Sequence, residues 1–198
     1  MRQAQIKRKT LETDISVKIN LDGQGQSKID TGVGFFDHML SAFLRFAFFD
    51  GEIFCKGDTC IDAHHTVEDV GIVLGQAFSE AVGAKAGIAR IASAYVPMDE
   101  ALAFCAADIS GRVHLHFDAA FSAPMCGQMD TQLCREFFRA FSQHAGLTLH
   151  ITVPYGQNDH HIMEAIFKAA GKALGDAVRL DARVKTVHST KGMLEGKA

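Results

Sequence analysis

One motif occurs twice in this chain at a fixed spacing. Residues 64–68 read His-His-Thr-Val-Glu, and residues 160–164 read His-His-Ile-Met-Glu, so that both histidines and the glutamate recur 96 positions later. The same spacing of 96 residues aligns Gly75 with Gly171. Similarity at a fixed period indicates an internal duplication. The chain is therefore expected to fold as two similar halves, each with its own copy of the motif.

The residue pattern predicts the same order of elements in each half: three strands, a helix, a strand and a helix. Strands are expected at residues 5–12, 14–21, 26–30, 52–56, 90–96, 102–109, 112–117 and 147–153. Helices are expected at residues 35–46, from the first motif to about residue 84, at 130–145 and at 159–178. Strands followed by helices favour an α+β fold, with four-stranded sheets and helices packed on one face. The predicted divisions are 1–88, 89–186 and a C-terminal loop and tail, 187–198.

The repeated residues are suited to binding metal ions. On a helix, the first histidine and the glutamate of each motif are at i,i+4, and one ion can reach both. Adjacent residues point about 100° apart, so the two histidines of each motif are expected to serve different ions. Aligning Phe43 with Phe141, 98 positions apart, also places Glu136 over His38. The eight candidate ligands are His38, His64, His65, Glu68, Glu136, His160, His161 and Glu164.

Eight ligands give four to each of two ions, with open positions for substrate or water. Imidazole and carboxylate ligands without thiolate are compatible with Mn, Fe or Zn, and the carboxylates favour Mn. His160, Glu164 and Lys168 form a stripe that is predicted to face away from the core of their own half. Ligands on such a stripe fit a site that another half or another subunit completes.

Cationic and hydroxyl residues predict an anionic ligand. Residues 189–192 (Ser-Thr-Lys-Gly) can hold a phosphate, and Arg90, Arg112 and Lys168 can contribute. These features indicate a dinuclear metal enzyme that acts on a small phosphorylated substrate, for which a hydrolase is the default. A metal-storage protein is the alternative, but storage proteins with such sites are all-α bundles. Strands in both halves count against it.

Composition excludes several other classes. A net charge of −3 gives no general attraction to nucleic acid or membrane, and no apolar run approaches the ~18 residues of a membrane span. The polar N-terminus is unlike a signal peptide. The five cysteines include no C-x-x-C and are expected to be reduced and mostly buried, as in a cytoplasmic protein.

Several ordered motifs resemble those of imidazoleglycerol-phosphate dehydratases. They are Arg-Lys-Thr-Leu-Glu-Thr at 8–13, Phe-Asp-His-Met-Leu at 36–40, His-His-Thr-Val-Glu-Asp at 64–69, Pro-Met-Asp-Glu-Ala at 97–101, Asp-Ile-Ser-Gly-Arg at 108–112, residues 160–169, and Ser-Thr-Lys-Gly at 189–192. The resemblance extends over nearly the whole chain. It implies the dehydration of imidazole glycerol phosphate to imidazole acetol phosphate in histidine biosynthesis, without the histidinol-phosphatase domain of some relatives.

The resemblance also implies two Mn²⁺ per active site, at subunit interfaces of a homo-oligomer of twenty-four chains. It assigns as metal ligands the candidates given above, apart from Glu136. Its substrate-contacting positions are Glu12, Arg90, Arg112, Lys168, Ser189 and Lys191. Glu12 is the candidate acid/base for the C2 proton, because it is not among the expected ligands.

Two positions depart from the family pattern. Glu136 stands where many relatives carry His, and His150 is the alternative eighth ligand, although a structural role is favoured for it because the repeat places Phe54 opposite. His188 stands where Pro is usual, which is expected to loosen the C-terminal loop.

Overall fold

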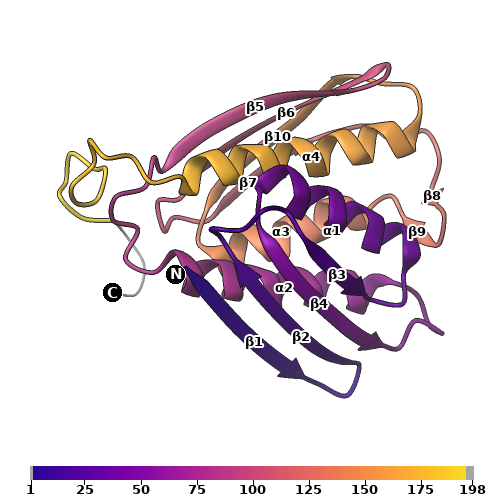
Figure 1. Ribbon diagram of the computed structural model, residues 1–198. Coiled ribbons are helices and arrows are strands. Elements are labelled where there is room, and N and C mark those ends of the chain that lie inside the picture. Colours follow the sequence, from indigo (N-terminus) through magenta and orange to yellow (C-terminus); the bar gives the residue numbers. More distant parts are fainter. Residues whose placement is uncertain (1, 195–198) are drawn as a thin grey trace.

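The computed structural model of the chain describes residues 2–194 (Figure 1). Residue 1 and residues 195–198, which belong to the predicted first half and C-terminal segment, lie outside the described residues. The first sheet and its helices comprise β1 (Gln3–Lys9), β2 (Thr13–Asn20), β3 (Ser27–Asp30), α1 (Gly34–Ala47), β4 (Asp50–Gly57) and α2 (His64–Val82). The strand order is β1-β2-β4-β3, and only the β3–β4 pair is parallel.

The second part of the chain repeats this arrangement. It comprises β5 (Ile91–Met98), β6 (Ala101–Asp108), β7 (His114–Asp118), α3 (Leu133–Ala145), β10 (Thr148–Tyr155) and α4 (Asp159–Val178). The strand order is β5-β6-β10-β7, and again only the pair in the corresponding position, β7–β10, is parallel. The predicted α+β fold with two four-stranded sheets is confirmed. The short hairpin of β8 (Met125–Cys126) and β9 (Met129–Asp130) was not predicted.

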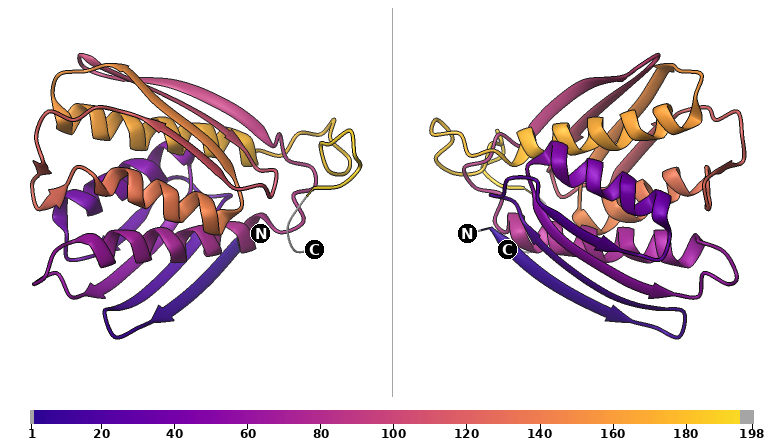
Figure 2. Two further views of the ribbon diagram at one scale, coloured as in Figure 1. Left: turned by 180° about the vertical axis from the view of Figure 1, so that it is seen from behind. Right: turned by 45° about the vertical axis from the view of Figure 1, so that its right-hand side comes forward.

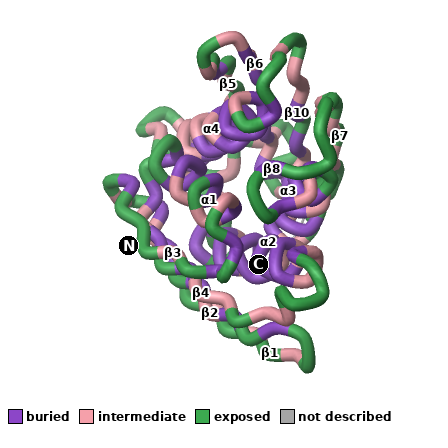
Figure 3. The backbone as a smooth tube through the Cα atoms, turned by 90° about the vertical axis from the view of Figure 1, so that its right-hand side faces the viewer, coloured by how far each residue is buried: buried purple, intermediate pink, exposed green. Residues whose placement is uncertain are grey.

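The four helices lie between the two sheets, as Figure 2 shows from two sides. Strand residues alternate, so that Ile15, Val17 and Ile19 of β2 face the helices and are buried. On the opposite sheet, Leu149 and Ile151 of β10 do the same. Figure 3 shows the buried parts of the chain concentrated in the middle of the molecule. Both sheets therefore share one core. Within it, α1 packs directly against α4, and α2 packs directly against α3.

Glycines allow helices from different halves to approach closely. A Cβ at Gly171 of α4 would collide with the backbone carbonyl of Phe43 in α1, and one at Gly75 of α2 would collide with that of Phe141 in α3. These are the pairs that the repeat aligns. Val33, His64 and Leu133 line one pocket at the beginnings of α1, α2 and α3, while His160 near the beginning of α4 packs on Phe35 of α1. All four helices therefore begin at the same end of the molecule.

The structure describes the helices and the cysteines about which the composition made predictions. Within residues 2–194, no helix is long and apolar enough to span a membrane. Cys105, Cys126 and Cys134 are buried, and burial raises the pKa of each of these thiols. Cys60 is exposed. The prediction of mostly buried thiols therefore holds for three of the five.

Candidate active site

Three predicted ligands from the two halves meet where α1 packs against α4. His38 Nε2 of α1 lies 3.5 Å from Glu164 Oε2, and His160 Nε2 lies 3.3 Å from the same oxygen. One ligand atom from each of these residues falls within 4.8 Å of the other two. We call this trio the first half-site. The stripe on α4 therefore faces the helix of the other half, as predicted for a site that another half completes.

Lys168 holds the remaining oxygen of the Glu164 carboxylate. Its Nζ donates to Glu164 Oε1 at 2.7 Å, one helical turn along α4. Burial alone would raise the pKa of Glu164, but the hydrogen bond and charge of Lys168, with a smaller effect of His38, keep this pKa below its usual value. Glu164 is therefore an ionised carboxylate whose Oε2 faces two imidazoles.

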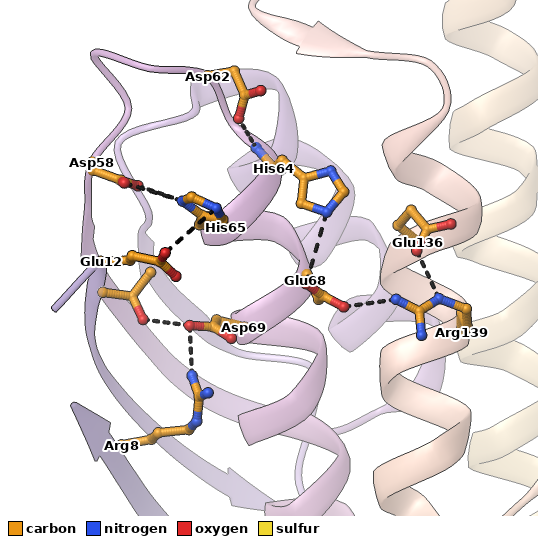
Figure 4. Close-up of polar contacts among 11 residues, drawn as sticks. Arg8, Glu12, Asp58, Asp62, His64, His65, Glu68, Asp69, Glu136 and Arg139 are labelled. Carbon is orange, nitrogen blue, oxygen red and sulfur yellow. Dashed lines mark hydrogen bonds and ion pairs between the residues drawn. The ribbon is translucent and has the colours of Figure 1, made fainter. Parts of the chain in front are cut away.

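The equivalent trio on the other helix pair is arranged differently. We call His64 and Glu68 of α2 with Glu136 of α3 the second half-site; His64 Nε2 lies 3.7 Å from Glu68 Oε2. Arg139 stands between the two carboxylates (Figure 4). Its Nη2 donates to Glu68 Oε1 and its Nε to Glu136 Oε2, both at 2.6 Å. Within the part of the chain that the structure describes, three ligand atoms converge only at the first half-site.

The second histidine of each motif points elsewhere. The ring planes of His64 and His65 are 88° apart, and those of His160 and His161 are 78° apart. That adjacent histidines serve different ions stays a prediction. Each half-site contains three of the expected ligands, so if each ion takes four, as predicted, the fourth lies outside these trios.

The second histidine of each motif is oriented by a carboxylate. His65 Nδ1 donates to Asp58 at 3.0 Å, and His161 Nδ1 donates to Glu100 at 2.7 Å. These hydrogen bonds raise the pKa of both imidazoles, and His161 is the main reason that the pKa of Glu100 falls to about 2. A carboxylate on Nδ1 fixes the ring and leaves Nε2 as the ligand atom. Sequence reasoning missed both roles; only Glu100 lay within a quoted motif.

Glu12 lies beside one of these histidines. It occupies the connection between β1 and β2, where its side chain is 53% exposed and its Oε1 lies 3.8 Å from His65 Nε2 (Figure 4). Its backbone N–H donates to Thr10 Oγ1 and its carbonyl accepts from Asp58 N–H, at 3.1 Å each. These two hydrogen bonds hold the loop in place, while the Glu12 carboxylate stays half-exposed beside His65.

Four of the predicted substrate-contacting residues line one pocket: Arg90, Arg112, Ser189 and Lys191. Asp108 holds the guanidinium of Arg90 through two hydrogen bonds of 2.7 and 3.0 Å. Arg90 also donates to the carbonyl oxygen of His188 at 2.7 Å. His188 Nδ1 lies 3.3 Å from Ala89 O, a contact that Pro cannot make. In the structure, His188 therefore ties the C-terminal loop to the start of β5.

The pocket and the half-sites lie at opposite ends of the helices. The half-sites lie near the beginnings of the helices, whereas the pocket is lined by Arg90, by Arg112 and by residues of the segment that follows α4. The backbone N–H of Arg90 donates to Ala177 O at 2.8 Å, which places the pocket beside the end of α4. The 14 residues from Glu164 to Val178 correspond to about 21 Å of helix between the first half-site and that end. Lys168 is also a predicted substrate contact, but it lies in the first half-site, bound to Glu164. A small substrate cannot reach a half-site and the pocket of the same chain.

His150 lies away from both half-sites. It is exposed on the outer face of β10, and its ring lies 5.6 Å from that of His114 and from that of His116 on β7. The helices cover the opposite face of this sheet, where Leu149 and Ile151 are buried. This position favours Glu136 over His150 as the eighth ligand, which remains a prediction.

The duplicated α+β fold differs from the all-α bundle of a storage protein, and it holds acid, imidazole and cation groups in ordered positions. The sequence profile of the imidazoleglycerol-phosphate dehydratase family matches residues 31–174. The dehydratase of Acetivibrio thermocellus is 57% identical over 98% of this chain and 99% of its own. That of Caldanaerobacter subterraneus is 54% identical over 98% and 100%.

Solved structures agree with this assignment. The crystal structure of the Staphylococcus aureus dehydratase has a TM-score of 0.82 and 42% identity, covering 90% of this chain and 99% of that chain. The Pyrococcus furiosus enzyme has a TM-score of 0.83 and 36% identity, covering 96% and 100%. The chain belongs to the imidazoleglycerol-phosphate dehydratase family, and it is a dehydratase, a lyase.

Proposed function

We propose that this chain dehydrates imidazole glycerol phosphate to imidazole acetol phosphate in histidine biosynthesis, with two Mn²⁺ per active site. Membership of the family supports the reaction. The observation that carries the metal dependence is the convergence of His38, His160 and Glu164 from both duplicated halves within 4.8 Å. A buried, ionised carboxylate facing two imidazoles is a ligand set suited to a divalent cation.

Each half-site offers three ligands to one ion, and a neighbouring subunit would supply the fourth. His65 and His161 suit this role, because a carboxylate on Nδ1 leaves the Nε2 of each available. Imidazole and carboxylate donors without thiolate are compatible with Mn, and Fe and Zn are the competing ions. The site residues thus fit the metal that the family implies.

The separation of half-site and pocket supports active sites at subunit interfaces. One subunit would present its half-sites to the phosphate pocket of another, in a homo-oligomer that we take to contain twenty-four chains, as the family resemblance implies. A cytoplasmic location fits an enzyme of histidine biosynthesis. Arg90, Arg112, Ser189 and Lys191 would bind the phosphate of the substrate, since guanidinium, ammonium and hydroxyl groups all donate to its oxygens.

The reaction needs one proton removed from C2 and one hydroxyl lost from C3. When bound, Mn²⁺ supplies positive charge that stabilises electron density on the imidazole ring of the substrate. Glu12 would accept the C2 proton, because its exposed carboxylate adjoins the imidazole of His65. The proton lost from C2 and the hydroxyl lost from C3 together make one molecule of water, and the enol becomes the ketone without redox change.

Chelation tests the metal dependence. Treatment with EDTA should abolish formation of the ketone product and shift the particle to a smaller size in light scattering, because ligands from two subunits would no longer share an ion. Adding Mn²⁺ back should restore both. Full turnover of metal-free protein would overturn the metal dependence; an unchanged particle size alone would remove the part about assembly. Release of inorganic phosphate would indicate a hydrolase instead.

The C-terminal pocket is expected to act in substrate binding rather than in metal binding. Lys191→Ala, or deletion of residues 189–198, should raise KM because the phosphate loses a cation, while the content of Mn²⁺ stays the same. Lys185→Ala is the matched control, since Lys185 is exposed in the same segment but does not line this pocket. Equal turnover of the Lys191→Ala and parent enzymes at sub-saturating substrate would contradict this role.

A further inference from the structure

The two half-sites descend from one duplicated unit but differ at three positions. Glu136 on α3 replaces the imidazole that His38 provides on α1, and Arg139 stands where the same register places Ser41. The cation of the first half-site, Lys168, has Ile72 as its counterpart on α2. Each half-site therefore has one cation, but from a different element.

The two cations hold their neighbouring carboxylates in a similar way. Lys168 takes Oε1 of Glu164, and Oε2 is left facing His38 and His160. Arg139 takes Oε1 of Glu68, and Oε2 is left facing His64. Up to this point the half-sites are equivalent.

Arg139 does something further that Lys168 does not. Its Nε binds Oε2 of Glu136, so the third candidate ligand of this half-site is already engaged. An ion that uses Glu136 has to share it with the guanidinium or displace the guanidinium, and it meets a positive charge in either case.

We propose that Arg139 is a positioning residue that holds Glu136 and weakens the second half-site, so that the two metal ions bind with unequal affinity. The first half-site, in which two imidazoles face Glu164 Oε2, fills first. The second half-site, in which one guanidinium holds an oxygen of both carboxylates, fills at a higher concentration of the ion. This inference rests on the proposed function, in which both half-sites bind metal.

The alternative is that Arg139 only joins α2 to α3. The backbones of these helices already meet at Gly71 and Gly75, where a Cβ would crowd the carbonyls of Phe137 and Phe141. A purely structural ion pair would affect thermal stability and would not change the affinity for metal. The two roles can therefore be separated by measuring binding.

The test is a titration of metal-free, full-length protein with Mn²⁺, followed by the electron paramagnetic resonance signal of the free ion. The parent protein should show two classes of site whose Kd values differ by about tenfold or more, which corresponds to ~1.4 kcal/mol. Arg139→Gln should tighten the weaker class by about tenfold and leave the tighter class unchanged. His38→Ala should remove the tighter class.

Arg135→Gln is the matched control, because Arg135 is exposed on the same helix one turn earlier and should leave both classes unchanged. If Arg139→Gln fails to assemble, Arg139→Lys keeps the charge but loses the planar fork, and a smaller tightening is expected. The inference is overturned by equal sites in the parent protein, or by Arg139 variants that leave the weaker class unchanged or weaken it. Absence of any Mn²⁺ binding by the parent would instead overturn the proposed function itself.

Discussion

Glu12→Gln is expected to lower kcat by about 10²–10⁴-fold, the usual contribution of a general acid–base group. The substitution keeps the size of the side chain and much of its hydrogen bonding but removes the carboxylate that would accept the C2 proton. Glu12 is exposed and not part of either half-site, so the amount of bound metal and the particle size should not change. Rate measurements with elemental analysis and light scattering test each part.

Retained binding is what separates a catalytic role from a structural one. Glu12→Gln should still bind the substrate, and crystals of this variant should contain it unreacted. Glu52→Gln is the matched control, because Glu52 is also a strand-associated, half-exposed glutamate whose contact is a surface ion pair with Lys18. If Glu12→Gln turns over at a near-normal rate, the proton passes to a carboxylate of the half-sites, with Glu68 and Glu164 as the candidates.

The fold could be predicted from the sequence because the duplication constrains it twice. A register of 96 residues relates the motif-bearing helices and one of 98 relates the first helices, and in the structure these registers govern which backbones touch. Gly171 meets Phe43 and Gly75 meets Phe141. Local patterning then placed every long element within a few residues, with the bounds of α4 predicted as they are found. The β8–β9 hairpin was not predicted, because strands of two residues are too short to show a periodic pattern.

The candidate residues of the site could be predicted from the sequence, but the hydrogen bonds and ion pairs between them could not. Helical spacing explains why His160 and Glu164 share a face, since both lie on one element. Nothing in that spacing indicates that Arg139 would bridge Glu68 and Glu136, because the bridge depends on how closely α2 approaches α3. Asp58 was missed for a related reason: its contact with His65 is made by a loop, whose path the residue pattern does not define. The candidate ligands thus follow from the sequence, whereas the hydrogen-bond partners of each candidate follow from packing.

The position of the phosphate pocket leads to a prediction about mixed oligomers. Two variants are each expected to be inactive alone: His160→Ala, which damages the first half-site, and Arg112→Ala, which damages the pocket. The 18 residues from His160 to Val178 correspond to about 27 Å of helix between the half-site and the end of α4 that adjoins the pocket, so under the proposed function an active site combines the half-site of one subunit with the pocket of another. Particles assembled from an equal mixture should therefore regain activity, at about a quarter of the parent level if pairing across the interface is random.

Two controls show whether recovered activity comes from shared sites. Mixing His160→Ala with Glu164→Ala should give no recovery, since both changes damage the same half-site. Mixing the two variants without dissociating their particles first should also give none, because the subunits cannot exchange partners. If co-assembled His160→Ala and Arg112→Ala chains stay inactive while forming particles of normal size, the half-site and the pocket do not work together across a subunit interface. The interfacial active site would then be wrong, even if both residues proved necessary for turnover.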